Sequence, residues 1–168
     1  MYAETAQRTY EPEGMKHATS IEKAYGGQLI EVASKSAVKR YEDFTAISDT
    51  SSRQYKLLQE GELQPNGLIS INGYVCAALG SRYGQIGDKF TFVLEKNGRR
   101  HSVKVIMADQ KQDKHTAGGN GLTDKDGNIM ELIVCTGQLP EAARTSGDCD
   151  KIEAVCGEIV KIIKESNK

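Results

Sequence analysis

The chain carries near its middle an apolar run that ends in carboxylates and other polar groups: Val105-Ile106-Met107-Ala108-Asp109-Gln110-Lys111-Gln112-Asp113-Lys114-His115-Thr116. Another acid, Glu131, opens the next apolar run, which is Leu132-Ile133-Val134-Cys135. Short apolar runs bounded by polar residues are typical of buried β-strands. If the two strands are adjacent, the acids at their ends meet, so we expect Asp109 and Glu131 to lie close together.

Two turn signals organise the residues before and within this stretch. Residues 68–80 hold two apolar runs that are separated by the hairpin-type dipeptide Asn72-Gly73. Residues 89–95 and 100–107 are strand-like and are separated by Lys96-Asn97-Gly98. We therefore predict a β-hairpin at each turn.

The C-terminal part of the chain continues this pattern. Residues 131–135 predict a strand, residues 137–144 a short helix with Pro140 near its start, and residues 158–163 a final strand by alternation. Several short strands with glycine turns and one short helix indicate a mainly β protein and favour a small barrel.

The first sixty residues have a different character. Residues 1–20 are polar and predict a mobile arm. Residues 20–60 carry a thin apolar stripe with weak helical spacing, although residues 54–59 could form a short strand. We therefore predict an N-terminal region, residues 1–60, that is an arm, a linker or a small helical subdomain, and a β domain over residues 66–165.

Composition excludes several classes of partner. The 168 residues carry a net charge of −1 and no Arg/Lys cluster with interleaved aromatic residues, so nothing favours nucleic acid or an anionic membrane surface. No stretch approaches the ~20 apolar residues of a membrane span. Residues 1–7 read like a mature N-terminus behind an initiator Met, which suggests that an export signal has been removed. We expect a secreted or cell-wall-associated protein, and the oligomeric state is left open.

The cysteines do not predict a metal site. Cys76, Cys135, Cys149 and Cys156 match no zinc spacing, and the histidines are scattered, so we expect no metal and no other cofactor. Cys149 and Cys156 are close in sequence and flank a polar turn, which favours a disulfide between them. Cys76 and Cys135 lie in apolar runs, where small buried thiols are at least as common as a second bridge.

The C-terminal part of the chain resembles a known family. The resemblance covers roughly residues 68–163 and lies in five segments: the strand that ends in Ala108-Asp109, the entry Gly87-Asp88-Lys89, the run Glu131-Leu132-Ile133-Val134, the short helix at residues 140–144, and Gly157-Glu158-Ile159-Val160. They look like a six-stranded double-psi β-barrel, and more narrowly like the three-aspartate domain of Gram-positive cell-wall and germination proteins. That domain is akin to the barrel of membrane-bound murein transglycosylase A and, more distantly, to rare lipoprotein A and expansins. Some segments are also similar to secreted or phage-associated proteins of Firmicutes.

The resemblance implies a protein that acts on peptidoglycan. In the transglycosylases of this fold, an aspartate in the barrel groove serves as acid and then as base on the β-1,4 bond between MurNAc and GlcNAc. Asp109 matches the family's aspartate before the glycine-rich loop, and Glu131 stands where the family has its second aspartate. The family's Asp-Thr-Gly-Gly is absent, because Gln110-Lys111-Gln112 follows Asp109.

The residue types suit glycosidic cleavage, which needs a protonated acid beside the leaving oxygen. A half-buried acid beside a second carboxylate has a raised pKa, so Asp109 and Glu131 are the candidate catalytic pair. We expect Asp113, His115 and Thr116 at the rim, in contact with substrate, and Tyr83 of the glycine-rich loop stacked on a sugar ring. The alternatives are an aspartate that accepts loop N–H bonds, a solvated Glu131 and a Tyr83 packed in the core.

Two hypotheses from different classes follow. The first is an exported, cell-wall-directed enzyme of the lytic transglycosylase kind, in which Asp109 carries the proton and Glu131 assists. The second is a non-catalytic barrel module that binds glycan or a protein partner. A toxin-like or phage-tail component is a third reading that the sequence leaves open.

Overall fold

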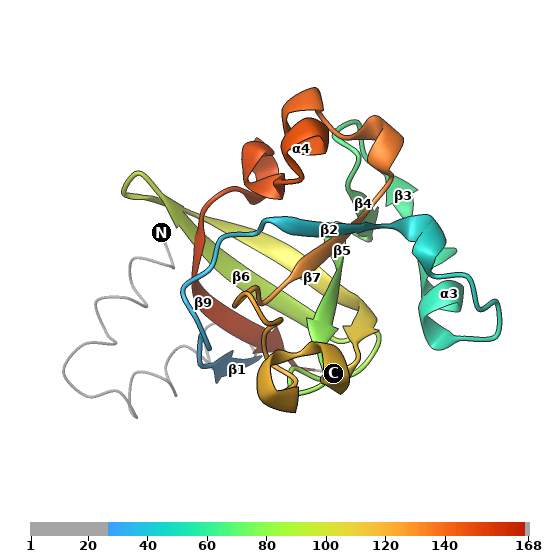
Figure 1. Ribbon diagram of the computed structural model, residues 1–168, viewed down its shortest axis with the longest axis horizontal. Coiled ribbons are helices and arrows are strands. Elements are labelled where there is room, and N and C mark those ends of the chain that lie inside the picture. Colours follow the sequence, from blue (N-terminus) through green and yellow to red (C-terminus); the bar gives the residue numbers. More distant parts are fainter. Residues whose placement is uncertain (1–26, 167–168) are drawn as a thin grey trace.

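The computed structural model describes residues 27–166, which form a nine-stranded mixed sheet with two short helices (Figure 1). The predicted mainly β class is therefore confirmed. The strands are β1 (Gly27–Ile30), β2 (Arg40–Asp43), β3 (Glu62–Leu63), β4 (Ile69–Ile71), β5 (Tyr74–Gly80), β6 (Lys89–Lys96), β7 (Arg99–Lys111), β8 (Glu131–Val134) and β9 (Glu158–Glu165). The helices are α3 (Arg53–Leu58) and α4 (Glu141–Ser146). Short 3-10 turns include η1 (Phe44–Ala46), η2 (Asp113–His115), η3 (Ala117–Gly119) and η4 (Thr136–Gln138).

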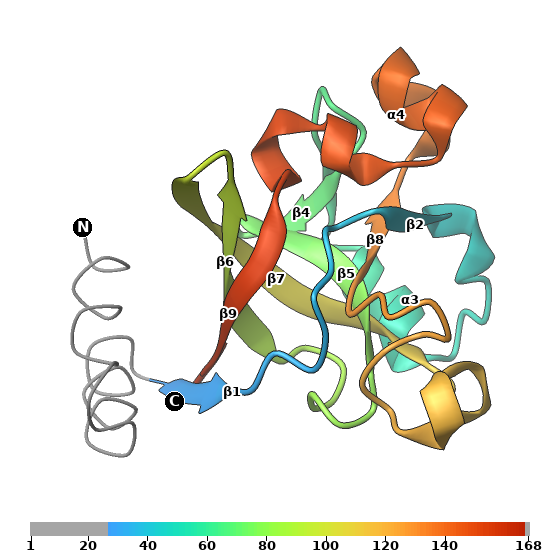
Figure 2. The same ribbon diagram turned by 60° about the vertical axis from the view of Figure 1, so that its left-hand side comes forward.

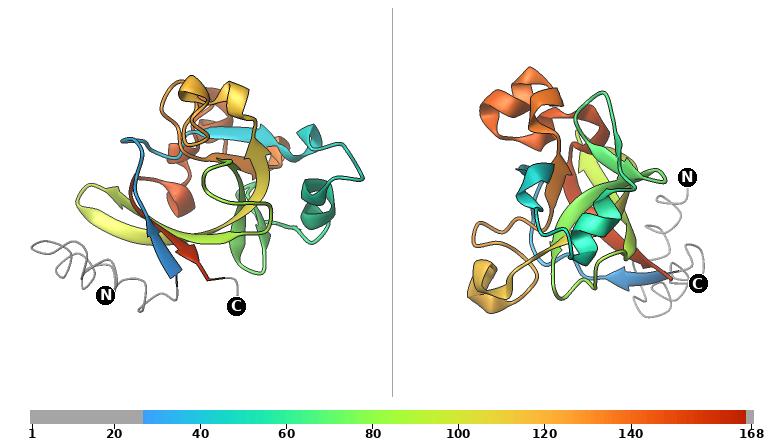
Figure 3. Two further views of the ribbon diagram at one scale, coloured as in Figure 1. Left: turned by 90° about the horizontal axis from the view of Figure 1, so that it is seen from below. Right: turned by 90° about the vertical axis from the view of Figure 1, so that its right-hand side faces the viewer.

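The sheet branches at β5. One path runs β1-β9-β6-β7-β5-β4-β3, and β8 pairs with β5 from the branch and carries β2 on its other side. All pairs are antiparallel except β5 with β7 and β2 with β8. The sheet curves around the core (Figure 3), but no closed ladder is formed within residues 27–166. β2 and β9 share no ladder there, and an isolated bridge joins Ala37, in the segment before β2, to Glu158 at the start of β9.

Both predicted hairpins are confirmed. β4 and β5 are joined through Asn72 and Gly73, with φ of 50° and 83°, and β6 and β7 through Asn97 and Gly98, with φ of 53° and 76°. Positive φ at both central residues is the type I′ pattern, whose twist matches that of the flanking strands. The Asn-Gly dipeptides therefore set these two pairings locally.

The sheet is buried on two faces. The main core gathers Phe90, Phe92 and Leu94 with many aliphatic side chains, while a second cluster contains Ile69, Ile71, Cys76, Ile106, Ala108 and Ile133. Leu57 and Leu58 of α3 pack against this second cluster. Because side chains alternate along a strand, β5 and β7 supply both clusters, which explains why their sequences are nearly continuous apolar runs.

Residues 27–60 do not follow their helical spacing. β1 lies beside β9 (Figure 2) and pairs with it, and β2 pairs in parallel with β8, so this region adds strands to the sheet. Residues 53–58 form helix α3, where a strand was predicted, and Ser52 caps it by accepting a bond from Tyr55 N at 3.1 Å. The arm predicted at residues 1–20 lies outside the described residues.

The C-terminal predictions hold. Helix α4 follows Pro140 and ends at Gly147, whose φ of 69° is the left-handed conformation common after helices, and β9 follows as the final strand. Among the described residues, no helix is long and apolar enough to span a membrane.

The disulfide predicted between Cys149 and Cys156 is wrong, because all four cysteines are free. Cys149 is buried and packs in the main core instead. Burial raises the pKa of the Cys76 thiol to about 12, and burial with the nearby charge of Asp148 raises that of Cys149 to about 12.

We expect thiol titration of the unreduced protein in denaturant to find all four thiols. In the native protein, Cys76 and Cys149 should react more slowly than Cys135 and Cys156, because only the first two are buried and reactivity requires an accessible thiolate. Prior reduction should leave the number of reactive thiols unchanged. Fewer than four thiols before reduction would show that a bridge exists.

Candidate functional site

An open cavity of about 420 Å³ lies where β2, β8, β5 and β7 run side by side. Both acids predicted as a catalytic pair, Asp109 and Glu131, line it. The remaining lining residues are mostly polar: Arg40, Glu42, Ala78, Gln110, Lys111, Gln112, His115 and Asp124. A cavity of this size is in the range of small-ligand sites.

Ala78 lies between the two predicted acids in the sheet. On β5, Ala78 is the register partner of Asp109 on one side and of Glu131 on the other. Adjacent strands lie ~4.8 Å apart, so the two acids stand roughly 10 Å apart at their backbones. Ala78 is 2% exposed and its methyl group leaves the space between them open.

A β-bulge aims Asp109 into this row. The partner of Ala77 is Met107, but the partner of Ala78 is Asp109, so Ala108 is the extra residue. In an unbroken ladder Asp109 would oppose Leu79, which packs in the main core. The bulge shifts the alternation by one residue and turns the carboxylate toward the cavity, which is a common use of bulges beside functional sites.

A third carboxyl group, that of Glu42, also lines the cavity and was missed by the sequence reading. It lies on β2, where Arg40 is the register partner of Glu131, and Glu42 is two residues further along the same face of the sheet. The weak helical spacing of residues 20–60 hid this strand. The only local signal was the short alternation in which Tyr41 packs on the main core while Arg40 and Glu42 do not.

The surroundings of Glu42 hold its carboxyl group neutral. Burial raises its pKa from 4.5 to about 9, with further upward contributions from a hydrogen bond to Asp109 and from the charges of Asp109 and Glu131, while Lys111 acts in the opposite direction. Glu42 Oε1 is buried and has no hydrogen-bond partner among the described residues. An ionised carboxylate there would carry a buried, unpaired charge, which is costly.

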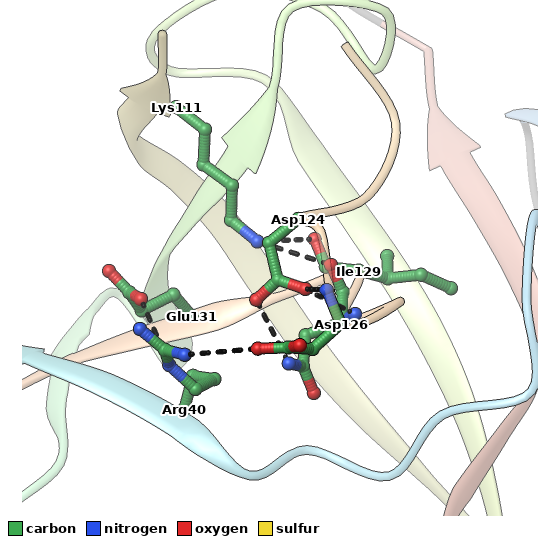
Figure 4. Close-up of polar contacts among 7 residues, drawn as sticks. Arg40, Lys111, Asp124, Asp126, Ile129 and Glu131 are labelled. Atoms are coloured by element: carbon green, nitrogen blue, oxygen red, sulfur yellow. Dashed lines mark hydrogen bonds and ion pairs between the residues drawn. The ribbon is translucent and has the colours of Figure 1, made fainter. Parts of the chain in front are cut away.

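The other two acids have donors or cations beside them. Asp109 Oδ1 accepts from Gln110 N at 2.9 Å and from Gln54 Nε2 of α3 at 3.4 Å. Glu131 Oε2 lies 3.8 Å from Arg40 Nε (Figure 4). Both acids therefore have polar partners within the site, unlike Glu42 Oε1.

Lys111 closes one side of the cavity. Its Nζ donates to the carbonyl oxygens of Asn128 at 3.3 Å and Ile129 at 3.4 Å, and Figure 4 shows it directed toward Asp124. Burial lowers the pKa of Lys111, although the neighbouring charges of Asp124, Glu131 and Glu42 act in the opposite direction. The cavity thus holds carboxyl groups and a desolvated ammonium together.

The predicted substrate-binding residues are dispersed. His115 lines the cavity, whereas the exposed Asp113 accepts a bond from Ser81 Oγ at 2.6 Å and is not part of the lining. Thr116 is buried and its Oγ1 holds a turn, donating to Asp113 O and accepting from Gly121 N. Tyr83, expected to stack on a sugar, is instead 1% exposed in the main core, because the turn with Tyr83 N bonded to Gly80 O directs the ring inward.

The side chains of the described residues do not indicate a metal site. Within residues 27–166 no group of three or more His, Cys, Asp or Glu side chains is arranged to hold one. Asp124, whose loop resembles part of a calcium site in sequence, instead accepts bonds from Asp126 N and Asn128 N in a turn.

No protein-family model, no curated protein and no solved structure matches the chain. The fold and the site define its class: a mainly β protein with an open, polar cavity in which a neutral carboxyl group lies beside other acids. A carboxyl group with a raised pKa beside other acids is an arrangement suited to acid–base chemistry.

Proposed function

We propose that this protein is an exported, cell-wall-directed enzyme that cleaves peptidoglycan glycan strands in the manner of a lytic transglycosylase. The observation that carries the proposal is the convergence of Glu42, Asp109 and Glu131 on one open cavity, with one carboxyl group kept neutral beside the others. Acid-catalysed glycosidic cleavage needs a proton donor at the leaving oxygen and negative charge near the developing oxocarbenium ion.

We further propose that the fold is a double-psi β-barrel built from β2, β5, β6, β7, β8 and β9. Two parallel pairs, β2 with β8 and β5 with β7, in an otherwise antiparallel sheet support this, because parallel neighbours require crossover connections. The bridge between Ala37 and Glu158 supports it as well, since it joins the segment that leads into β2 to the start of β9.

The proposed reaction consumes no water molecule. A carboxyl group protonates the glycosidic oxygen, the C1–O bond breaks, and the C6 hydroxyl of the same muramic residue attacks C1 while a carboxylate accepts its proton. The product is a 1,6-anhydro sugar and the enzyme returns to its starting protonation. We assign the glycan contact to His115, because it is exposed and lines the cavity.

The purified protein is expected to release 1,6-anhydro-muropeptides from isolated sacculi, detected by chromatography with mass spectrometry. Asp109→Asn should lower the rate at least about tenfold, because it removes a charge at the reacting centre. Asp49→Asn is the matched control, since that exposed carboxylate contacts only Ser51 of its own loop. If clean wild-type protein releases no anhydro product, the enzymatic proposal is rejected.

A specific observation favours a second candidate, a non-catalytic glycan-binding module. Asp109 and Glu131, the two acids expected to act, already have partners in Gln54 and Arg40, as in a structural polar network. This candidate predicts that the protein sediments with sacculi and releases nothing.

A further inference from the structure

Of the four carboxyl groups that line the cavity, those of Glu42, Asp109 and Glu131 differ in their surroundings. Asp109 accepts hydrogen bonds from Gln54 and Gln110, and Glu131 faces the Arg40 guanidinium. Each of these two carboxyl groups therefore has a donor or a cation beside it. Glu42 differs from both, because one of its oxygens is buried without a partner and its neighbours include the two other acids.

We infer that Glu42, and not Asp109, is the residue that donates the proton to the glycosidic oxygen, with Asp109 as the carboxylate that keeps Glu42 protonated. This inference rests on the proposed function and names the acid within that same site. No motif pointed to it, since Glu42 lies in the N-terminal region that sequence spacing assigned to helices.

Burial and position support the assignment. Glu42 and Asp109 line the same cavity, and Glu42 Oε1 is buried without a hydrogen-bond partner among the described residues, where a negative charge would be costly. Asp109 Oδ1, by contrast, accepts hydrogen bonds from two N–H donors, Gln54 Nε2 and Gln110 N. The proton of the pair therefore resides on Glu42, in agreement with its pKa of about 9.

The surroundings also suit Glu42 once its proton has left. The charge of Lys111, from β7, acts to stabilise the Glu42 carboxylate, while Asp109 of β7 and Glu131 of β8 act against it. Loss of the proton to the leaving oxygen creates a carboxylate near Lys111 and near the positive charge developing at C1. That carboxylate then accepts the proton of the attacking C6 hydroxyl, which restores neutral Glu42.

The test compares Glu42→Gln, Asp109→Asn and the exposed control Glu60→Gln in the sacculus assay over a range of pH. We expect Glu42→Gln to lower anhydro-product release at least about 100-fold, the scale of general acid catalysis, while sedimentation with sacculi is kept. Glutamine has the shape and neutrality of the protonated acid, so the variant should fold with an unchanged circular dichroism spectrum. Glu60→Gln should match wild type.

The pH profile separates the acid from its positioning partner. In wild type the rate should fall as the pH rises toward about 9, where Glu42 loses its proton. Asp109→Asn should retain measurable activity and move this alkaline limb to lower pH, because it removes the charge and the hydrogen bond that help keep Glu42 protonated. A merely structural role of Asp109 would leave the limb in place.

These measurements distinguish a failure of the Glu42 assignment from a failure of the proposed function. Near-wild-type release by Glu42→Gln, together with its loss in Asp109→Asn, would overturn the Glu42 assignment and leave the proposed function intact. An alkaline limb that does not move in Asp109→Asn would overturn the pairing of these residues. A wild-type protein that releases nothing, from sacculi that a known lytic enzyme digests, would overturn the function and the assignment together.

Discussion

The free energy of unfolding is expected to fall as the pH rises from about 4.5 to about 9, and Glu42→Gln is expected to remove most of that fall. Between these values the folded protein keeps a proton on Glu42, whereas the unfolded chain releases it. Rising pH therefore favours the unfolded chain, and stability contributed by the neutral form is greatest below the unfolded pKa. One proton that the folded protein keeps and the unfolded chain releases lowers the free energy of unfolding by about 1.4 kcal/mol per pH unit. Because Glu42 is partly exposed, the total effect is expected to be smaller than for a fully buried group.

Chemical denaturation of wild type, Glu42→Gln and Glu60→Gln at pH values from about 5 to about 9 measures the effect. Glu60 is an exposed control of the same residue type, so its variant should follow the wild-type slope. Parallel slopes for wild type and Glu42→Gln would contradict a buried, protonated Glu42. This measurement needs no substrate and is independent of any enzymatic assay.

Gly80→Ala is expected to lower the free energy of unfolding by about 3 kcal/mol, near the upper end of the usual range for overpacking. A Cβ at Gly80 would overlap the backbone carbonyl of Gly121, and a backbone atom moves less readily than a flexible side-chain end. The hydrogen bond from Arg82 N to Gly121 O, 3.1 Å long, holds that carbonyl in place. Because the loop around Gly121 also carries His115 and Asp124, its displacement should deform the cavity.

Gly137→Ala is the matched control for this substitution. No heavy atom lies within 4 Å of its built Cβ and its φ is not positive, so its effect should stay within about 0.5 kcal/mol. Thermal and denaturant unfolding of both variants measure the difference. Equal stabilities of the two variants would show that the loop around Gly121 can move aside without loss.

The elements that sequence analysis predicted correctly depend on near neighbours. The Asn-Gly dipeptides set two hairpins through their own positive φ angles, and apolar runs buried on two faces give strands whatever their partners. The strands β1 and β2 were misassigned, because their polar sequences carry weak periodicity and pairing with distant strands outweighed it. Residues 53–58 form a helix instead of a strand, with Ser52 as its cap and Leu57 and Leu58 packed on the second cluster.

The site was predicted in part for the same reason. Asp109 and Glu131 were found because each lies at the end of a recognisable apolar run, and both line the cavity. Tyr83 was placed at the site from its loop position, but a turn buries its ring in the core. Glu42 gave only the weak signal of a short alternation around Tyr41, which does not mark it as a neighbour of other acids.

The sequence by itself determined the mainly β class, the two hairpins and the two acids at strand ends, because alternation, glycine turns and Asn-Gly dipeptides act over a few residues. Only the tertiary structure decided that β2 lies beside β8, that a bulge at Ala108 turns Asp109 toward the cavity, and that Glu42 keeps its proton there. These features depend on strand register and on desolvation by segments remote in the chain. The local pattern of residues 40–43 does not determine strand register or desolvation. Glu42 can therefore be recognised as part of the cavity only from the folded sheet.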